Sequence, residues 1–514
     1  MSHDRCDRAF SIACKWQDDI VHMMNAVSVD EMIGLEREWF SQGRTAADLM
    51  EQAGWGIACA MAKFFPDPGL VRLYLGKGHN AGDALCAARH LRAWGWRVEL
   101  EAAFPEVEWA VLTRQQWRAL QETPEAPRRP VETTVIVDAL LGIGARGALR
   151  EPIRSAVSHI NDQRMLNATP VVALDIPTGL NADTGESDDL AVVADYTFFI
   201  GAPKRGLLSS ASVNHVGRLE PIALGEIPPT CGNASLQLVT PSTFPRSLAP
   251  RPHDFHKGNA GRVAIMAGSP GMEGAALLCA TAAMRAGAGL VTLWVKESAH
   301  TTTVARACPA LMVRPFGDWR EISLGNAHAF AIGPGLGDMQ ETEFQSMAEL
   351  IAATPVPGVF DADALNAIAR HQGHHCLRES HVITPHPGEF SRLAPLSAMR
   401  PREEACSHFT QYHPSVLLLK GARTLVQQRG APLYHNSTGH AGMATAGMGD
   451  VLTGVIAGLQ AQGIPSIVAA CAGAWLCGRA AEISIMRKCS SIHSLTAPDL
   501  LESLGSAMRE WQSA

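Results

Sequence analysis

The sequence predicts an α/β protein with two three-layer domains, each a largely parallel sheet between two layers of helices. Short apolar runs rich in β-branched residues end in glycine, proline or aspartate and alternate with helical patterns, which is typical of buried parallel strands. These runs form two series, separated at 225–252 by a stretch rich in proline, serine and threonine. The 514 residues suffice for two such domains.

The first series lies between residues 25 and 225. Its expected strands are VRLYLG (71–76), WRVELEAAF (96–104), TTVIVDALLG (133–142) and PVVALDIPTG (170–179), with a helix over 83–95. The loop GKGHNAGD after the first strand has the form of a glycine-rich anion loop at a helix N-terminus. Three residues at or just after the ends of these strands, Asn80, Asp138 and Thr178, could supply oxygens to one cation. The alternative is three separate loop caps.

The second series begins after the proposed linker at 226–250, where we also expect a short edge element. Its expected strands are 261–268, 290–295, 327–337, 358–365, 380–389 and 415–422, and its expected helices are 275–287 and 449–463. Polar clusters follow these strands: HKG (256–258), GPGLG (333–337), DADALN (361–366), TPHPGE (384–389) and KGART (420–424). Ligands bind at the carboxyl ends of strands in such sheets, so we expect these clusters to form one site.

The most informative segment of this half is GMATAGMGDVLTG at 442–454. Gly447 and Gly449 let an anion approach the backbone, and the free N–H groups of a starting helix point at it. Asp450 is suited to take a proton from a hydroxyl held beside a phosphate. The alternative is that Asp450 only caps the helix.

Two further side chains of this half have a functional and a structural interpretation. Pro385 and Pro387 restrain the backbone around His386, so its imidazole is either aimed at a ligand or held as a structural histidine. Lys420 ends the run VLLLK and either meets a phosphate or extends its amine to water. Together the clusters predict a nucleotide site with a hydroxyl-bearing substrate opposite Asp450.

Composition excludes other classes of protein. The chain is 46% hydrophobic and 18% charged, as in soluble globular proteins, and its net charge of −7 argues against nucleic-acid binding. The tail 1–24 carries charges throughout, unlike a signal peptide, and Arg285 interrupts the apolar stretch 274–295, which argues against a membrane span. Scattered cysteines fit a reducing compartment. We expect a cytoplasmic protein that acts on small molecules and forms a homo-oligomer.

Residues 251–514 resemble the ADP-dependent NAD(P)H-hydrate dehydratases, which have a ribokinase-like fold. The resemblance rests on HKGNAGRVAIMAGSPG, GPGLG, DADALN, TPHPGEF, LKGART and NSTGHAGMATAGMGD. It implies that ADP or ATP phosphorylates the hydroxyl of hydrated NAD(P)H, after which phosphate is eliminated and the nicotinamide double bond is restored. With ADP the other product is AMP. Mg²⁺ is expected from phosphoryl transfer in general.

The resemblance also implies roles for single residues. The adenine nucleotide would contact Lys420, Gly421, Ala422, Arg423, Thr424 and Gly449. The hydrate would contact Ala275, Gly335, Gly337, His386 and Asp450. Asp450 would be the base, and the 447–449 amides would stabilise charge on the transferring group. Arg423 replaces a residue that is usually small in this family, so it would add a phosphate contact or narrow the adenine pocket.

Residues 25–225 resemble the NAD(P)H-hydrate epimerases, which are Rossmann-like and usually bind potassium. LMEQAG (49–54), AGDALCAARHL, DALLG, DIPTGLNADTG and GAPKRGL (201–207) carry this resemblance. It implies a K⁺ site at Asn80, Asp138 and Thr178. It implies substrate contacts from His79, Asn80, Ala81, Gly82, Asp83, Gly142, Ile143, Gly144, Ala145, Arg146, Gly147, Ala148 and Asp175. Asp175 would transfer protons while the ring opens and recloses, with Lys204 nearby.

This half departs from the epimerase pattern at three positions. His79 and Ala81 replace the asparagine and glycine of an N-N-G-G-D core, and Thr178 replaces a serine. We expect the Cβ of Ala81 to hinder close approach of a phosphate to the backbone.

The sequence therefore predicts a bifunctional enzyme that epimerises the R and S hydrates and dehydrates the S form. One alternative is a ribokinase-like kinase acting on a vitamin precursor, whose product would stay phosphorylated. In another, the N-terminal half is a non-catalytic binding module.

Overall fold

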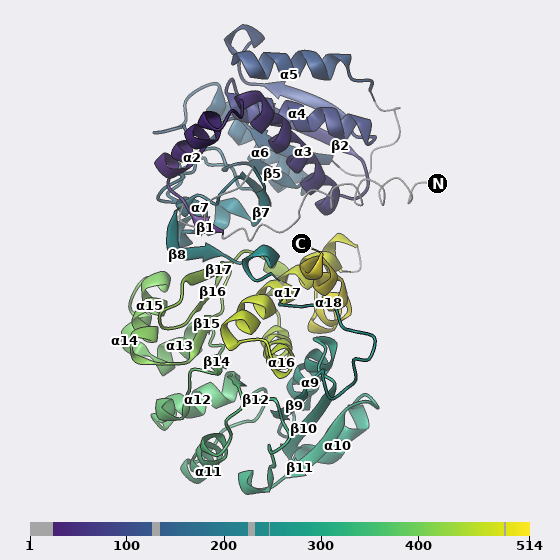
Figure 1. Ribbon diagram of the computed structural model, residues 1–514, viewed down its shortest axis with the longest axis vertical. Helices are drawn as coiled ribbons and strands as arrows, with labels where there is room; N and C mark the ends of the chain where they lie inside the picture. Colours follow the sequence, from purple (N-terminus) through teal and green to yellow (C-terminus); the bar gives the residue numbers. More distant parts are fainter. Residues whose placement is uncertain (1–23, 126–133, 225–231, 246, 488–489, 514) are drawn as a thin grey trace. The chain divides into compact units, whose positions relative to one another are not determined.

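The computed structural model describes residues 24–125, 134–224, 232–245, 247–487 and 490–513 (Figure 1). They divide into two compact units, Met1–Ala234 and Ser235–Ala514.

The N-terminal unit contains a six-stranded sheet in the order β3-β2-β4-β5-β6-β7, in which all neighbours are parallel. Its strands are β2 (Leu70–Leu75), β3 (Arg97–Ala102), β4 (Thr134–Ala139), β5 (Val171–Leu174), β6 (Tyr196–Ile200) and β7 (Arg218–Ile222), preceded in the chain by β1 (Asn25–Ala26). Its helices are α2 (Val29–Ser41), α3 (Ala46–Phe64), α4 (His79–Ala93), α5 (Val111–Glu122), α6 (Ile153–Asn167), α7 (Arg205–Leu208) and α8 (Val213–Val216). Strand order reverses between β2 and β4, as in a doubly wound fold, and ligands bind at such a switch point.

The C-terminal unit contains a larger sheet whose order is β8-β17-β16-β15-β14-β13-β12-β9-β10-β11. The strands are β8 (Asn233–Leu238), β9 (Arg262–Met266), β10 (Leu290–Lys296), β11 (Met312–Phe316), β12 (Ala329–Ile332), β13 (Gly358–Phe360), β14 (His381–Ile383), β15 (Val416–Leu419), β16 (Thr424–Gln427) and β17 (Leu433–Asn436). The pairs from β11 to β15 are parallel, while β16 is antiparallel to both of its neighbours. A second switch point lies between β9 and β12.

Helices cover both faces of this sheet, which confirms the three-layer prediction (Figure 1). One face bears α9 (Glu273–Arg285), α16 (Met448–Ala461), α17 (Ser466–Met486) and α18 (Ala497–Gln512). The opposite face bears α11 (Glu341–Ala352), α12 (Ala362–Arg370), α13 (Pro387–Leu393), α14 (Pro395–Ala398) and α15 (Arg402–Tyr412), and α10 (His300–Arg306) follows β10. Alternate strand residues enter the two cores: Val263 joins the first and Ala264 the second.

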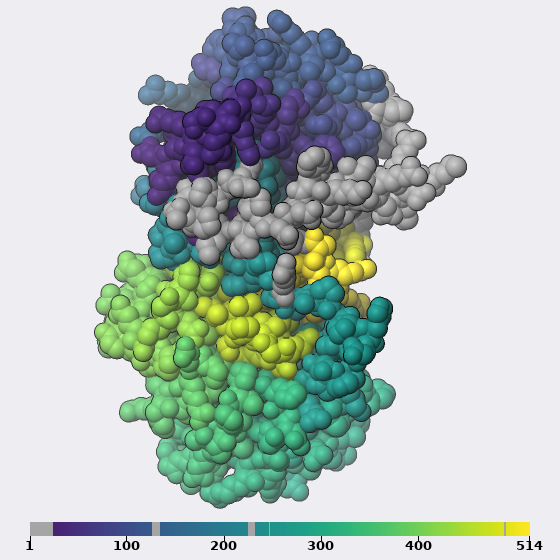
Figure 2. All heavy atoms as spheres, in the orientation of Figure 1, coloured from purple at the N-terminus to yellow at the C-terminus, as the bar shows by residue number. Residues whose placement is uncertain are grey.

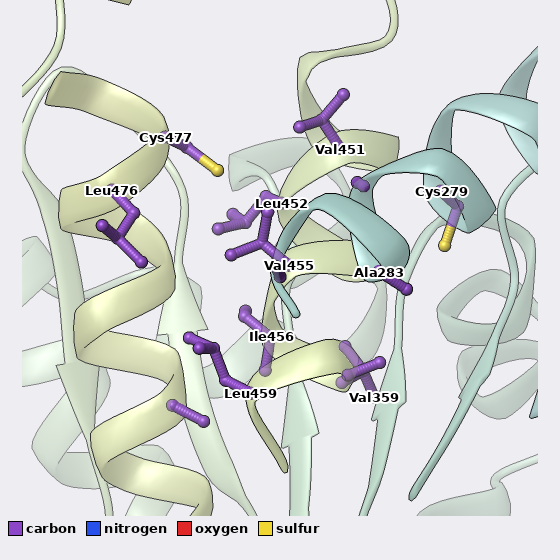
Figure 3. Close-up of a cluster of buried hydrophobic side chains, with 14 of the residues drawn as sticks. Cys279, Ala283, Val359, Val451, Leu452, Val455, Ile456, Leu459, Leu476 and Cys477 are labelled. Carbon is purple, nitrogen blue, oxygen red and sulfur yellow. The ribbon is translucent and has the colours of Figure 1, made fainter. Parts of the chain in front are cut away.

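Close packing fixes the position of α16 between α9 and α17. Figure 3 shows Val451, Val455 and their neighbours on α16 between α9 and α17. A Cβ on Gly454 would lie 2.0 Å from the carbonyl oxygen of Cys279, so only glycine permits this approach. Helix α17 is long and apolar enough to span a membrane, but most of it is buried inside the protein, as in the core helix of a globular domain.

The stretch predicted as a linker with a short edge element contains the strand β8. β8 pairs in parallel with β17 and extends the C-terminal sheet. Residues after it pack against the last helix: Trp511 Nε1 donates to Ser247 Oγ at 2.9 Å, and Figure 2 shows the teal and yellow segments of this unit together. The limits of the functional domains stay a prediction.

Candidate active sites

The glycine turn before α16 positions Asp450 in the first turn of the helix. Gly447 is the N-cap residue, with a φ of 89° that favours glycine, and α16 begins at Met448. The alternative that Asp450 caps the helix is therefore wrong. A Cβ on Gly449 would lie 3.3 Å from Lys420 Nζ and 3.5 Å from Asp361 Oδ2. The absence of a side chain at Gly449 thus lets a lysine and an aspartate approach the start of the helix.

Asp361 links the lysine after β15 to α16. Lys420 Nζ donates to Asp361 Oδ1 at 2.8 Å, and Thr453 Oγ1 donates to Asp361 Oδ2 at 2.8 Å. Asp361 is only 1% exposed. Burial acts to lower the pKa of Lys420, but Asp361 and Glu389 outweigh it, so this pKa lies above its usual value. Lys420 therefore carries a positive charge at this end of the helix, and the alternative that its amine only extends to water is wrong.

The environment of Asp450 suits a general base. Burial raises the pKa of its carboxyl group to about 7, the neighbouring Asp361 adds to the rise, and Lys420 opposes it. A carboxyl group that titrates near neutrality can accept a proton from a bound hydroxyl group. Its first-turn position also places it beside the free N–H groups of α16.

His386 both caps α13 and remains half exposed. Its Nδ1 accepts hydrogen bonds from the backbone N–H groups of Gly388 at 3.0 Å and Glu389 at 3.3 Å. Its Nε2 lies 3.5 Å from Glu389 Oε1, and the imidazole is 52% exposed. Glu389 Oε2 in turn lies 3.7 Å from Lys420 Nζ. Glu389 therefore connects His386 to the charged group at α16.

The GPGLG loop packs against the start of α9. Gly335 has a φ of 62°, and a Cβ there would lie 2.7 Å from the carbonyl oxygen of Met272 and 3.2 Å from Ala275 Cβ. The N–H of Gly337 donates to Asp363 Oδ2 at 2.8 Å, and Asp363 also raises the pKa of Asp450. Gly335 and Ala275 thus lie together at the switch point between β9 and β12, and Asp363 links Gly337 to the surroundings of Asp450.

The predicted nucleotide-binding residues in the turn between β15 and β16 differ in their exposure to solvent. Gly421 and Ala422 are exposed, whereas the Arg423 side chain is buried. Burial lowers the pKa of His435 to about 3, and Arg423 contributes to this shift, so the two side chains are neighbours. Arg402 Nη2 donates to the carbonyl oxygens of Lys420 at 3.2 Å and Arg423 at 3.0 Å. The burial of Arg423 does not support the expected phosphate contact.

In the N-terminal unit the three predicted cation ligands lie together. Thr178 donates to Asp138 through its N–H and through its hydroxyl group, both at 2.8 Å. Asn80 Nδ2 donates to the carbonyl oxygens of Leu141 at 3.0 Å and Leu174 at 3.2 Å. The N–H of Leu141 donates to Thr178 Oγ1 at 3.2 Å. The three residues therefore belong to one hydrogen-bonded group and are not three separate caps.

This group has the oxygen atoms that a hard cation could bind. The buried Asn80 Oδ1 has no hydrogen-bond partner among the described residues. Burial raises the pKa of Asp138 to about 6, although hydrogen bonds from Thr178 oppose the rise. An unsatisfied carbonyl oxygen and a buried carboxylate are the oxygen donors that a hard cation requires.

Asp175 occupies a strained position next to a buried lysine. Its φ of 63° is uncommon for a residue other than glycine. Its carboxylate pairs with Lys204, which is 1% exposed and also donates to the carbonyl oxygen of Ile200 at 2.8 Å. The predicted proximity of Lys204 to Asp175 is confirmed.

Two more carboxyl groups face Asp175. Burial raises the pKa of Glu36, on α2, and raises that of Asp83 well above its usual value; Asp175 adds to both shifts. Asp83 belongs to the predicted substrate loop. Glu36 lies in no recognisable motif, and nothing in the sequence singles it out.

The remaining substrate-loop predictions have mixed outcomes. The side chain of Ala81 is fully buried, so its Cβ does not stand in the path of a phosphate as expected. A Cβ on Gly82 would lie 2.5 Å from Met50 Cε, which explains the glycine by packing. Gly142 lies next to Asn80, whereas 144–148 form an exposed loop with no contact that ties Arg146 to Asp175.

Family models match both units. Residues 263–504 match the model described as NAD(P)H-hydrate dehydratase, and residues 46–206 match the one described as YjeF-related protein N-terminus. A solved structure from Bacillus subtilis, an ADP/ATP-dependent NAD(P)H-hydrate dehydratase co-crystallised with ATP and Mg²⁺, is 28% identical. It covers 53% of this chain and 97% of its own, with a TM-score of 0.46.

Full-length relatives extend over both units. A protein of Moorella thermoacetica is 34% identical over 497 residues, covering 90% of this chain and 92% of its own. A protein of Escherichia coli K12 is 35% identical over 472 residues, covering 90% of this chain and 89% of its own. Both are called bifunctional NAD(P)H-hydrate repair enzyme Nnr. The fold and its two polar sites define a two-domain α/β enzyme. The chain belongs to the family of bifunctional NAD(P)H-hydrate repair enzymes.

Proposed function

We propose that the chain repairs hydrated NAD(P)H in two steps, epimerising the R and S hydrates in its N-terminal unit and dehydrating the S hydrate at the expense of ADP in its C-terminal unit. The observation that carries this proposal is Asp450, whose pKa lies near neutrality beside Lys420 and the start of α16. Membership of the repair-enzyme family supplies the substrate.

In the dehydratase, the hydroxyl oxygen of the hydrate attacks the terminal phosphorus of ADP while Asp450 takes the proton of that hydroxyl group. The bond between that phosphorus and the bridging oxygen breaks, and AMP leaves. Lys420 and the N–H groups of 447–449 stabilise the charge on the transferring group. The C–O bond to the new phosphate then breaks with loss of a ring proton, which restores the double bond and releases phosphate.

Mg²⁺ would neutralise phosphate charge during this transfer. Asp361, the most buried carboxylate here, is already engaged by Lys420 and Thr453. We therefore expect Mg²⁺ to enter mainly on the phosphates of the nucleotide, as Mg²⁺ commonly does.

In the epimerase, Asp175 transfers the proton that lets the hydrated ring open and reclose. Lys204 holds the carboxylate in place, since the two groups form a buried ion pair. K⁺ would be held by Asn80, Asp138 and Thr178, where it supplies positive charge at the carboxyl ends of β2 and β4. This arrangement favours a catalytic N-terminal unit over a binding module.

The test is recovery of reduced-nicotinamide absorbance from a mixture of R and S hydrates with ADP. Full recovery by the wild type supports both activities. Asp175→Asn should stop near the S fraction, and unchanged recovery by this variant would favour the binding module. A product that stays phosphorylated, without absorbance recovery, would identify a small-molecule kinase instead.

We also propose a cytoplasmic location, supported by eight free cysteines among the described residues, six of them buried. The absence of nucleic-acid and membrane partners and the homo-oligomeric state remain predictions.

A further inference from the structure

A hollow of about 460 Å³ lies on the α12–α13 side of the C-terminal unit. Its lining residues are Asp338, Asn366, Ala369, Arg370 and Arg392. Two guanidinium groups face a single carboxylate, so the hollow is positively charged.

Both arginines retain free hydrogen-bonding capacity. Arg392 donates from Nε at 3.1 Å and from Nη2 at 2.9 Å to the side-chain oxygen of Asn366, which fixes the plane of the guanidinium group. Arg370 Nη2 donates to Asp338 Oδ1 at 3.0 Å, and these two side chains are 49% and 74% exposed. Because a guanidinium group has five N–H donors, each arginine can still bind an anion.

The hollow begins where the predicted hydrate-binding residues end. Asp338 directly follows Gly337, the last glycine of the GPGLG loop. Arg392 lies near the His386 end of α13: a Cβ on Gly388 would lie 2.9 Å from the His386 imidazole and 3.9 Å from Arg392 Nη1. A long substrate with its reacting hydroxyl at Asp450 could therefore extend past His386 into the hollow.

We propose that this hollow binds a phosphate group of the NAD(P)H hydrate, either the pyrophosphate or the 2′-phosphate of the adenosine ribose. The inference rests on the proposed dehydratase function. Arginine binds phosphate with two parallel hydrogen bonds, and a volume of this order accommodates a phosphorylated ribose. Asp338 forms an ion pair with Arg370 when no phosphate is bound, so it competes with the phosphate for the Arg370 guanidinium group.

The test compares dehydratase kinetics with S-NADPH hydrate and S-NADH hydrate at saturating ADP. Arg370→Gln and Arg392→Gln should each raise KM for NADPH hydrate, which carries both the pyrophosphate and the 2′-phosphate, about tenfold or more. The value of kcat should change little, since one charge-assisted contact to the substrate is lost. Asp338→Asn should lower that KM, because it removes the competing carboxylate. Arg509→Gln, on α18, is the matched control and should leave both constants unchanged.

The pattern of changes identifies the group that is bound. A loss confined to NADPH hydrate supports the 2′-phosphate, and an equal loss with both hydrates supports the pyrophosphate. Unchanged KM values in an active enzyme would overturn the hollow as a binding site and leave the proposed function standing. A wild-type enzyme that converts neither hydrate would instead overturn the function itself. Because the Arg370 side chain is about half exposed, Arg370→Gln keeps the test valid even if Arg392→Gln does not fold.

Discussion

Replacement of Asp450 by asparagine should make the C-terminal unit more stable while it removes dehydratase activity. Asp450 is a partly buried carboxyl group beside Asp361, and its ionised form is disfavoured in the folded chain. Asparagine has nearly the same shape and does not ionise. The variant should bind ADP and lose turnover on the order of 10²-fold or more, as expected for a positioned base.

The size of the stability gain follows from the pKa shift. The pKa rises from 3.8 to about 7 on folding, so the folded chain holds this proton more tightly than the unfolded chain does. Wild-type stability therefore falls as pH rises through this range, and the full loss is present above about pH 7. At 1.36 kcal/mol per pKa unit the loss reaches about 4 kcal/mol as an upper value. The asparagine variant avoids this loss.

Thermal unfolding as a function of pH measures the effect. A unit of about 280 residues has an unfolding entropy of about 0.6 kcal/mol/K, so the variant should melt up to about 7 °C higher than the wild type near pH 8. Near pH 5 the difference should shrink to about 3 °C, because the loss grows from about pH 3.8 upward and has reached only about 1.6 kcal/mol at pH 5. Asp30→Asn, at an exposed carboxylate in the first turn of α2, is the control.

Two results would refute this reasoning. A melting difference that stays the same from acidic to alkaline pH would show that Asp450 does not titrate as described. Near-normal turnover in the asparagine variant would remove Asp450 from the role of base.

Three other substitutions test the surroundings of the two sites. Asp361→Asn should move the acidic limb of the dehydratase pH–rate profile to lower pH, because a negative charge that raises the pKa of Asp450 is removed; an unmoved limb would exclude this coupling. Asn80→Leu should abolish the rise in melting temperature that we expect KCl to give over NaCl, and a persistent rise would place the cation elsewhere. Gly335→Ala should cost about 2 kcal/mol in urea unfolding and raise KM for the hydrate. Gly430→Ala has a similar positive φ in open space and isolates the effect of crowding at Gly335; equal losses would rule that effect out.

Most central strands of both sheets could be predicted from the sequence, whereas the central strand β6 and the edge strands β7 and β11 were missed. Strands such as β9 and β15 are continuous apolar runs because helices cover them on both faces. The run expected at 96–104 forms β3, an edge strand of partly exposed residues, and the expected strands at 133–142, 327–337 and 380–389 all end earlier because their polar ends form loops. The short strands β16 and β17 owe their place to pairing with β15 and β8, which no local pattern reveals.

Single residues of the sites were predictable where a loop motif carried them. Asp450 and His386 stand in glycine- or proline-defined turns whose chemistry is local. Asp361 was visible within DADALN, but its contact with Lys420 joins residues 59 positions apart and depends on the sheet order. Glu36 reaches its site from a helix without any motif, and the burial of Arg423 depends on neighbours from other strands.

The strand β8 determines where the two activities could be separated in a gene. A fragment begun at residue 251 would lose β8 and expose the backbone of β17 as an open edge, which invites aggregation. It would also lose Ser247, the partner of Trp511 on the last helix. A freestanding dehydratase must therefore begin before Asn233. Recombination that exchanges one activity for another would have to cut the coding sequence before Asn233, within the proline-rich stretch, rather than after that stretch.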